Sequence, residues 1–317
     1  MQVLIIFAGG VILFRLAGIT LLKFEVGRTI LTLASKLIWL FPVGIIGQII
    51  GNRYLELFNL FAFIIFLKMP ISTMFQSMYQ VIGMLVTPIK HRFKLPSREN
   101  YILKGDYILP FSGKWTTVNG GVSKELSHSW SILPQRYAYD FIIVDDNGKS
   151  SSGDRMSVDS YYCYGKDIIA PGDGVVVRLI DKYKDSFVDG KNAYCNAGRI
   201  EGNSIVIKHN EHEYSVVAHI MQGSFKVKVG DIVKQGDIIA KCGNSGNSSE
   251  PHIHFQLQAG ENFFLSAGLP IAFSDIAAQE KKNYSELDKR PHDNNLQVID
   301  NKSYIGRGLE VWNTTTE

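Results

Sequence analysis

The chain is poor in cysteine and carries little net charge. It has 3 cysteines among its 317 residues, at positions 163, 195 and 242. These are too few and too scattered for a disulfide framework, and they do not establish a compartment. The 33 lysines and arginines nearly balance the 30 aspartates and glutamates, and the small positive excess lies in the first 88 residues. Because the remainder is close to neutral, it gives no support for nucleic-acid binding, which normally needs a clustered basic surface, and we expect no nucleic acid as a partner.

Charge is nearly absent from long stretches of the N-terminal region. Residues 1–14, 37–52 and 69–89 carry no charged side chain, and leucine, isoleucine and phenylalanine fill much of the intervals between them. Such runs approach the roughly 20 residues that cross a bilayer. A buried helical domain in a soluble protein is the alternative, but few polar residues are available to solvate it. We therefore predict an all-α membrane region over residues 1–89.

About three transmembrane helices are expected in this region. They lie near residues 2–22, 30–52 and 55–88, and the last could consist of two shorter segments. No basic residue precedes the first apolar run and no small-x-small site follows it, so we expect no cleaved signal peptide. A juxtamembrane linker follows over residues 90–110.

The rest of the chain has the pattern of short β-strands. Four runs are rich in β-branched and aromatic residues, namely 137–144, 174–180, 202–208 and 214–220. Turns such as Pro171-Gly172-Asp173-Gly174 separate them. The predicted fold class is mainly β, an antiparallel sandwich or open barrel. We expect this domain to cover residues 111–276 and a polar C-terminal extension to cover 277–317.

Two histidines stand one residue apart on one of these expected strands. Side chains at positions i and i+2 of a strand share a face, so the Cβ atoms of His252 and His254 are about 6 to 7 Å apart. One imidazole can then bind a metal while the other contacts the water of that metal. Two exposed histidines on a solvated strand would have the same spacing. A third histidine, His219, ends an apolar run upstream.

The stretch from His219 to Phe255 resembles the lysostaphin-type zinc endopeptidases, which cut bacterial cell-wall peptides. The matching pieces, in order, are His219-Ile220, Val227-Lys228-Val229-Gly230-Asp231-Ile232-Val233-Lys234-Gln235-Gly236-Asp237, Gly243-Asn244-Ser245-Gly246-Asn247 and Pro251-His252-Ile253-His254-Phe255. A looser resemblance runs from Trp115 to Ile276. Biotinyl and lipoyl carrier domains have similar Gly-Asp turns, but the chain has none of their lysine attachment motifs.

The resemblance implies two further zinc ligands on an earlier strand, a histidine and an aspartate four positions after it. Asp140 matches the aspartate, but Arg136 occupies the histidine position. A guanidinium stays protonated and offers no lone pair to a metal. The nearest replacement is His128. Pro134 lies between His128 and Asp140 and could turn the chain so that the two side chains meet. If His128 is instead a surface histidine, the chain is a degenerate relative that does not bind zinc.

With His128 as the displaced ligand, the resemblance implies one Zn²⁺ per chain, held by His128, Asp140 and His254. One coordination position would remain for water, whose pKa would fall from about 15.7 toward roughly 7. His252 is then the expected general base, and His219 would orient the water or donate to the developing oxyanion. These two roles could be exchanged.

The predicted function is therefore a membrane-anchored zinc endopeptidase that hydrolyses cross-bridges or stem peptides of peptidoglycan. The alternative is an inactive peptidase-like domain that serves as a binding or scaffolding module in the cell envelope. We expect a multi-pass protein of the cell membrane with the peptidase domain facing the wall. The basic residues Lys90, Arg92, Lys94 and Arg98 oppose this orientation, because positive charge favours the cytoplasmic side.

Overall fold

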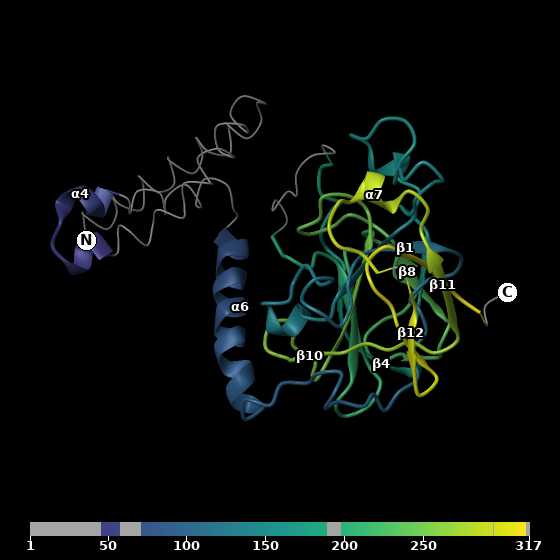
Figure 1. The fold of residues 1–317 in the computed structure, drawn as a ribbon, viewed down its shortest axis with the longest axis horizontal. Helices are drawn as coiled ribbons and strands as arrows, with labels where there is room; N and C mark the ends of the chain where they lie inside the picture. Colours follow the sequence, from purple (N-terminus) through teal and green to yellow (C-terminus); the bar gives the residue numbers. More distant parts are fainter. Residues whose placement is uncertain (1–45, 58–70, 189–197, 294, 315–317) are drawn as a thin grey trace. The chain divides into compact units, whose positions relative to one another are not determined.

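An antiparallel sheet of ten strands dominates the protein (Figure 1). The computed structural model describes residues 46–57, 71–188, 198–293 and 295–314. The strands run in the order β11-β14-β1-β2-β9-β6-β5-β4-β7, and β10 also pairs with β9. Two further sheets have two strands each, β3 with β8 and β12 with β13. The prediction of a mainly β, antiparallel domain is confirmed.

The strands are β1 (Trp115–Asn119), β2 (Tyr139–Ile142), β3 (Asp167–Ile169), β4 (Gly174–Ile180), β5 (Ser204–Lys208), β6 (Tyr214–Ala218), β7 (Ile232–Val233), β8 (Ile238–Lys241), β9 (Ile253–Gln258), β10 (Gly268–Leu269), β11 (Ile276–Glu280), β12 (Gln297–Ile299), β13 (Lys302–Tyr304) and β14 (Leu309–Asn313). The helices of the described residues are α4 (Arg53–Glu56), α6 (Ile71–Lys90) and α7 (Tyr284–Leu287), with the 3₁₀ turns η3 (Leu133–Gln135) and η4 (Val158–Ser160).

The chain divides into two compact units, Met1–Met74 and Phe75–Glu317. In the part of the chain that the structure describes, no helix is both long and apolar enough to span a bilayer. The expected all-α membrane region therefore has no support from the described helices. Of the expected transmembrane helices, the one near 2–22 lies outside the described residues. Those near 30–52 and 55–88 lie partly outside them.

Strand β9 shows how the main core forms. Its alternate residues Ile253, Phe255 and Leu257 are fully buried and belong to one large apolar cluster. Buried residues of β3, β4, β5 and β8 join the same cluster, so the core lies between the large sheet and the β3–β8 pair. Because side chains alternate along a strand, His254, Gln256 and Gln258 point to the other face of the sheet.

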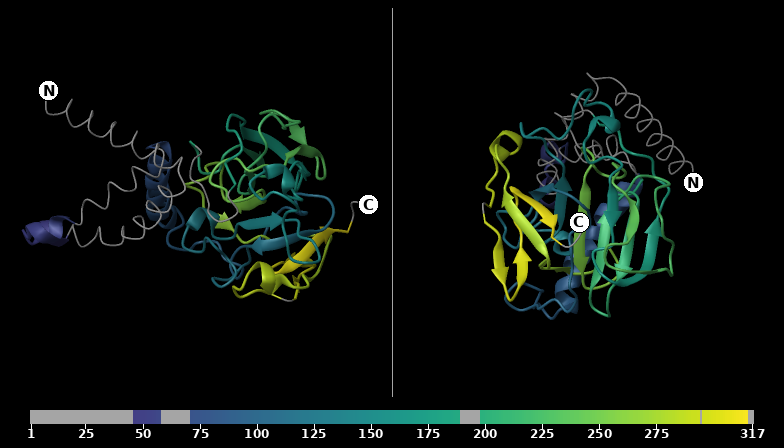
Figure 2. Two further views of the ribbon diagram at one scale, coloured as in Figure 1. Left: turned by 90° about the horizontal axis from the view of Figure 1, so that it is seen from above. Right: turned by 90° about the vertical axis from the view of Figure 1, so that its right-hand side faces the viewer.

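The C-terminal extension, residues 277–317, contributes to the large sheet. Strand β14 lies between β1 and β11, and Figure 2 shows the yellow strands β11 and β14 at one edge of the domain. The buried Asn313 side chain fixes the end of β14. Its Nδ2 donates to the carbonyl groups of Leu109 and Phe111, and its Oδ1 accepts from the Leu109 amide. The extension is thus integrated into the fold, although its composition is polar.

A buried carboxylate connects the segment after α6 to the sheet. Glu213 accepts hydrogen bonds from the backbone amides of Lys104 and Gly105 and from the hydroxyl of Tyr107. Burial alone would raise the pKa of Glu213, but these donors outweigh it and lower the pKa below the ordinary value. Hydrogen bonds therefore stabilise the buried charge of Glu213, and the same bonds hold residues 104–107 against the turn before β6.

Candidate metal and catalytic site

Strand register brings four positions of the site into one row across the sheet. Asn119 of β1 faces Asp140 of β2, and Asp140 faces His254 of β9. His254 in turn faces Ala218 of β6, directly before His219. Residues from four separate parts of the chain thus converge on one patch of the sheet.

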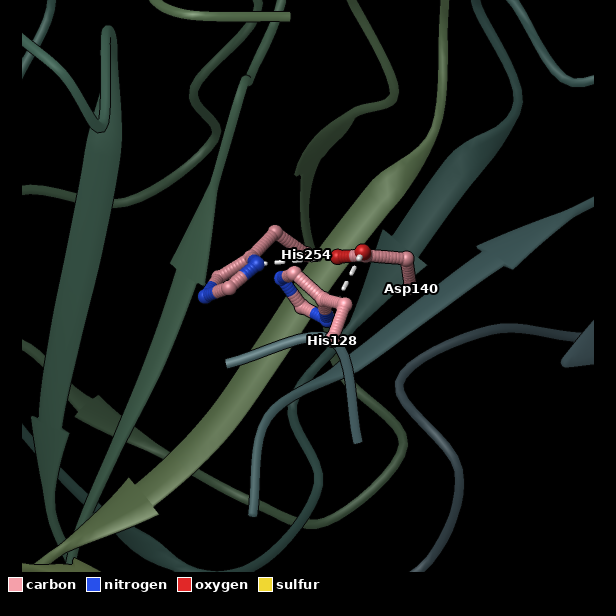
Figure 3. Close-up of side chains that lie close together, drawn as sticks. All are labelled: His128, Asp140 and His254. Carbon is pink, nitrogen blue, oxygen red and sulfur yellow. Dashed lines mark hydrogen bonds and ion pairs between the residues drawn. The ribbon is translucent and has the colours of Figure 1, made fainter. Parts of the chain in front are cut away.

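Three of the predicted residues form a group that could hold a metal ion. One possible ligand atom from each of His128, Asp140 and His254 lies within 4.8 Å of the other two (Figure 3). Nδ1 of His254 is 2.9 Å from Oδ1 of Asp140, and Nδ1 of His128 is 3.6 Å from Oδ2. Two imidazoles and one carboxylate with an open fourth position are typical of a catalytic zinc site.

The Asp140 carboxylate is buried and ionised. Burial alone would raise its pKa, but His128, the hydrogen bond with His254, and His252 together hold the pKa well below the ordinary value. Nδ2 of Asn119 donates to Oδ2 of Asp140 at 2.8 Å and so fixes the orientation of the carboxylate. Sequence reasoning missed Asn119, because its contact with Asp140 comes from strand pairing and the chain has no local motif for it.

A chain of side-chain amides determines which nitrogen of His254 carries hydrogen. Nε2 of Gln258 donates to the carbonyl of Gly260, and Nε2 of Gln256 donates to Oε1 of Gln258. Oε1 of Gln256 therefore faces Nε2 of His254, 3.0 Å away. A backbone carbonyl can only accept, so the direction of every bond in the chain is fixed. Nε2 of His254 must be the protonated nitrogen.

The consequence is that Nδ1 of a neutral His254 presents a lone pair to the ionised Asp140. Two acceptors 2.9 Å apart repel each other unless a proton or a cation lies between them. Burial lowers the pKa of His254, but Asp140 outweighs burial and raises it, so a proton can take that place. A divalent cation with His128 as third ligand fits the same place, and the donor set suits zinc.

Replacing Gln256 with leucine tests the amide chain. Leucine keeps most of the volume but removes the acceptor for Nε2 of His254, so the imidazole loses its fixed tautomer. Because partners of this kind contribute about 10- to 100-fold to metal affinity, we expect zinc affinity to fall by that factor. Competition with a chromogenic chelator measures it. Gln258→Leu is the matched control and should lose less, since Gln256 also donates to the carbonyl of Pro134. Equal zinc affinities for both variants and the wild type would contradict the proposed role of the side-chain amides.

The segment that carries His128 is held by the residue at the expected ligand position. Nε of Arg136 donates to the carbonyl of Trp130, and its guanidinium lies 5.1 Å from the centre of the Trp130 ring. The hydroxyl of Ser127 donates to the carbonyl of Arg136 at 2.8 Å. Arg136 therefore closes a loop over residues 127–136, and this loop presents His128 to Asp140.

His219 and His252, the predicted catalytic pair, lie together beside the metal group, with ring centres 4.7 Å apart. Nδ1 of His219 donates to the carbonyl of Ser245, and Nδ1 of His252 donates to the carbonyl of Glu250. In the neutral form, each ring is left with Nε2 as its acceptor. Nε2 of His252 lies 3.7 Å from Oδ1 of Asp140. Either ring can therefore accept a proton at the site.

His219 has an unusual backbone conformation and a lowered pKa. Its φ of 62° is in the left-handed region, which non-glycine residues rarely adopt and which occurs at functional sites. Burial and the neighbouring His252 and His254 lower its pKa well below the ordinary value. His219 therefore stays neutral at neutral pH.

The protein itself covers one side of the site. Phe263 and Phe264 pack with Val206 and Val216 on the sheet face that carries Gln256. The ring of Phe263 lies 6.4 Å from that of His254. The His128 side chain keeps 29% of its surface exposed and that of His252 keeps 14%, against 6% for His254. A substrate therefore reaches the site from the side of His128 and His252.

Comparisons with known proteins agree with this geometry. Residues 155–264 match the model of peptidase family M23, a range that contains His219, His252 and His254 but not His128 or Asp140. The chain is 29% identical over 129 residues to an uncharacterized metalloprotease of Haemophilus influenzae, which is 40% of this chain and 24% of that protein. It is 27% identical over 183 residues to the glycyl-glycine endopeptidase ALE-1 of Staphylococcus capitis, 57% of this chain and 45% of the relative.

A third relative is named for a different role. The murein hydrolase activator NlpD of Salmonella dublin is 32% identical over 132 residues, 42% of this chain and 30% of the activator. The chain therefore spans less than half the length of each of these three relatives.

Proposed function

Because the chain contains a peptidase M23 domain of the lysostaphin type, we propose that it is a zinc endopeptidase that hydrolyses peptide bonds of bacterial peptidoglycan, in cross-bridges or stem peptides. The observation that carries this proposal is Nδ1 of His254 facing the ionised Asp140 at 2.9 Å, with His128 beside them. The names of the relatives, a glycyl-glycine endopeptidase and a peptidoglycan DD-endopeptidase of Vibrio cholerae among them, support the substrate class.

In the proposed mechanism, each residue acts through a stated atom. His128, Asp140 and His254 would hold a zinc ion, which when bound would supply Lewis acidity to the attacking water and the scissile carbonyl. Nε2 of His252 accepts the proton of the attacking water and passes it to the leaving amine, while its Nδ1–H stays on the Glu250 carbonyl. Nε2 of His219 orients the water, and its Nδ1–H stays on the carbonyl of Ser245. Asn119 holds the Asp140 carboxylate in place.

A second candidate is an inactive module that binds peptidoglycan or activates another hydrolase. Arg136 favours it, because it occupies the position at which the lysostaphin-type enzymes have a ligand. One relative is named as an activator of murein hydrolases, which also supports this candidate. In this case His128 would not bind zinc, and the domain would recognise the wall without cleaving it.

Membrane attachment through residues 1–89, with the domain facing the wall, is a further part of the proposal. The long uncharged runs of that region support it. Flotation of the protein with lipid vesicles tests the attachment separately from peptidase activity.

The activity is tested by incubating the full-length protein in detergent with purified peptidoglycan and measuring the new amino groups released. We expect release that a chelator abolishes and added zinc restores. Binding to the sacculi without new amino groups, with zinc supplied, would overturn the enzyme proposal and favour the second candidate.

A further inference from the structure

The part of helix α6 from Phe75 onward exposes a continuous apolar stripe. Its members Phe75, Met78, Ile82, Leu85 and Ile89 recur every three or four residues and therefore lie on one helix face. Each has between 46% and 67% of its surface exposed. Five large apolar side chains in a row are more than the scattered exposure that is normal on a soluble surface.

The other face of α6 is attached to the β domain, so the stripe cannot turn inward. Nε2 of Gln76 donates to the carbonyl of Gly198, and the hydroxyl of Thr87 donates to the carbonyl of Leu265. Between them, a Cβ at Gly83 would lie 1.9 Å from the carbonyl oxygen of Phe264, so only glycine allows this approach. Three contacts along about three turns thus fix which face points outward.

Basic residues and further apolar side chains extend the stripe beyond the end of α6. Lys90, Arg92 and Lys94 are exposed, and no acidic residue occurs between them. Phe93 in the same segment is 79% exposed and Ile102 is 89% exposed. Apolar side chains next to clustered basic ones are typical of protein surfaces that bind anionic membranes.

A cavity of about 360 Å³ opens at the same end of α6. His91, Lys94, Asn100, Tyr101 and His212 line it, and no carboxylate does. The nearby Glu213 accepts hydrogen bonds from Lys104, Gly105, Tyr107, Asn210 and Tyr101, so its charge is already satisfied. Lys94 therefore brings a positive charge to the lining, while Asn100 and Tyr101 already donate to the carbonyl of Leu95 and to Glu213.

We propose that the stripe and this cavity together form a binding site for an anionic phospholipid, with α6 lying in the surface layer of the bilayer and the phosphate headgroup in the cavity. This inference rests on the proposed membrane attachment and is independent of peptidase activity. A second copy of the helix is the rival occupant, but pairing of two helices would leave the basic segment and Phe93 without a role.

Fluorescence quenching in vesicles tests the proposal on the full-length protein. Cys163 and Cys242 are buried, and Cys195→Ser removes the third thiol. A single new cysteine, Ile82→Cys, carries an environment-sensitive fluorophore, and Ile232→Cys on β7, 76% exposed, is the matched control. In phosphatidylglycerol vesicles with brominated acyl chains, we expect at least about a two-fold loss of fluorescence at position 82 and none at position 232, because interfacial helices reach the acyl boundary.

A second variant tests whether the cavity binds the phosphate headgroup. Lys94→Gln combined with His212→Gln removes the lysine charge and one imidazole from the cavity and leaves the five apolar residues of the stripe unchanged. We expect quenching at position 82 to be stronger in phosphatidylglycerol than in phosphatidylcholine vesicles for the parent, and equal in the two for the double variant. Free inorganic phosphate should not change the signal if a lipid is the ligand, and displacement by free phosphate would overturn the proposal.

The remaining outcomes separate this inference from the attachment itself. If the protein floats with vesicles and position 82 is not quenched, the attachment holds and the α6 proposal is wrong. Energy transfer between labelled copies at position 82 without lipid quenching would assign the stripe to helix pairing. A protein that does not float with vesicles would overturn the attachment and this inference together.

Discussion

Replacing His252 with alanine is expected to leave zinc bound and to reduce the rate of peptide hydrolysis about 100- to 10,000-fold, the usual contribution of a general base. The geometry gives two reasons. His252 donates from Nδ1 to the Glu250 carbonyl, so Nε2 is free for the proton of the water. His252 also lies outside the group formed by His128, Asp140 and His254, so its removal deletes no ligand.

The measurement is kcat on a synthetic wall peptide, with zinc determined on the same samples. His292→Ala, which removes a histidine that packs against Tyr284, is the control and should change neither value. His219→Ala in the same assay separates the two proposed roles, since removal of the base should cost more than removal of the orienting group. Loss of zinc from the His252→Ala protein would make His252 a ligand and contradict the assignment.

The second large effect is expected from His254→Ala, which should abolish both zinc binding and hydrolysis. His254 is the buried centre of the site, and its Nδ1 lone pair faces Asp140 at 2.9 Å. Without it, only His128 and Asp140 remain, fewer than the three protein ligands of a catalytic zinc site. We expect the zinc content of the purified variant to fall to less than about a tenth of the wild-type value.

Folding must be checked in this variant, because Asp140 would lose a hydrogen-bond partner. His254→Gln is the companion variant, since its amide can still donate to Asp140 but is a poor zinc ligand. Both variants should retain the circular dichroism of the wild type. Wild-type zinc content in either variant would mean that the metal is held elsewhere.

The fold could be predicted where the pattern is local. Alternation along residues 253–258 placed one face of β9 in the core and put His254 on the other. Asp140 and His219 followed from the family resemblance of the sequence around them, and register brings both next to β9. The role of each in zinc binding or catalysis stays a prediction.

The supporting contacts could not be predicted, because they depend on register between distant strands. Asn119 reaches Asp140 only because β1 and β2 pair in one particular register. The amide chain from Gln256 to Gly260 depends on the turn after β9. Strand β14 belongs to an extension whose overall composition is polar, and its pairing with β1 and β11 and the contacts of Asn313 order it.

Zinc stoichiometry of the full-length protein beside its His128→Ala variant tests the central claim most directly. His128 is the one proposed ligand that departs from the lysostaphin-type pattern, because Arg136 stands where those enzymes have that ligand. Elemental analysis should find one zinc per chain in the parent and a large loss in the variant. A folded parent without zinc after the metal is supplied, or a variant that keeps one zinc per chain, would contradict the site formed by His128, Asp140 and His254.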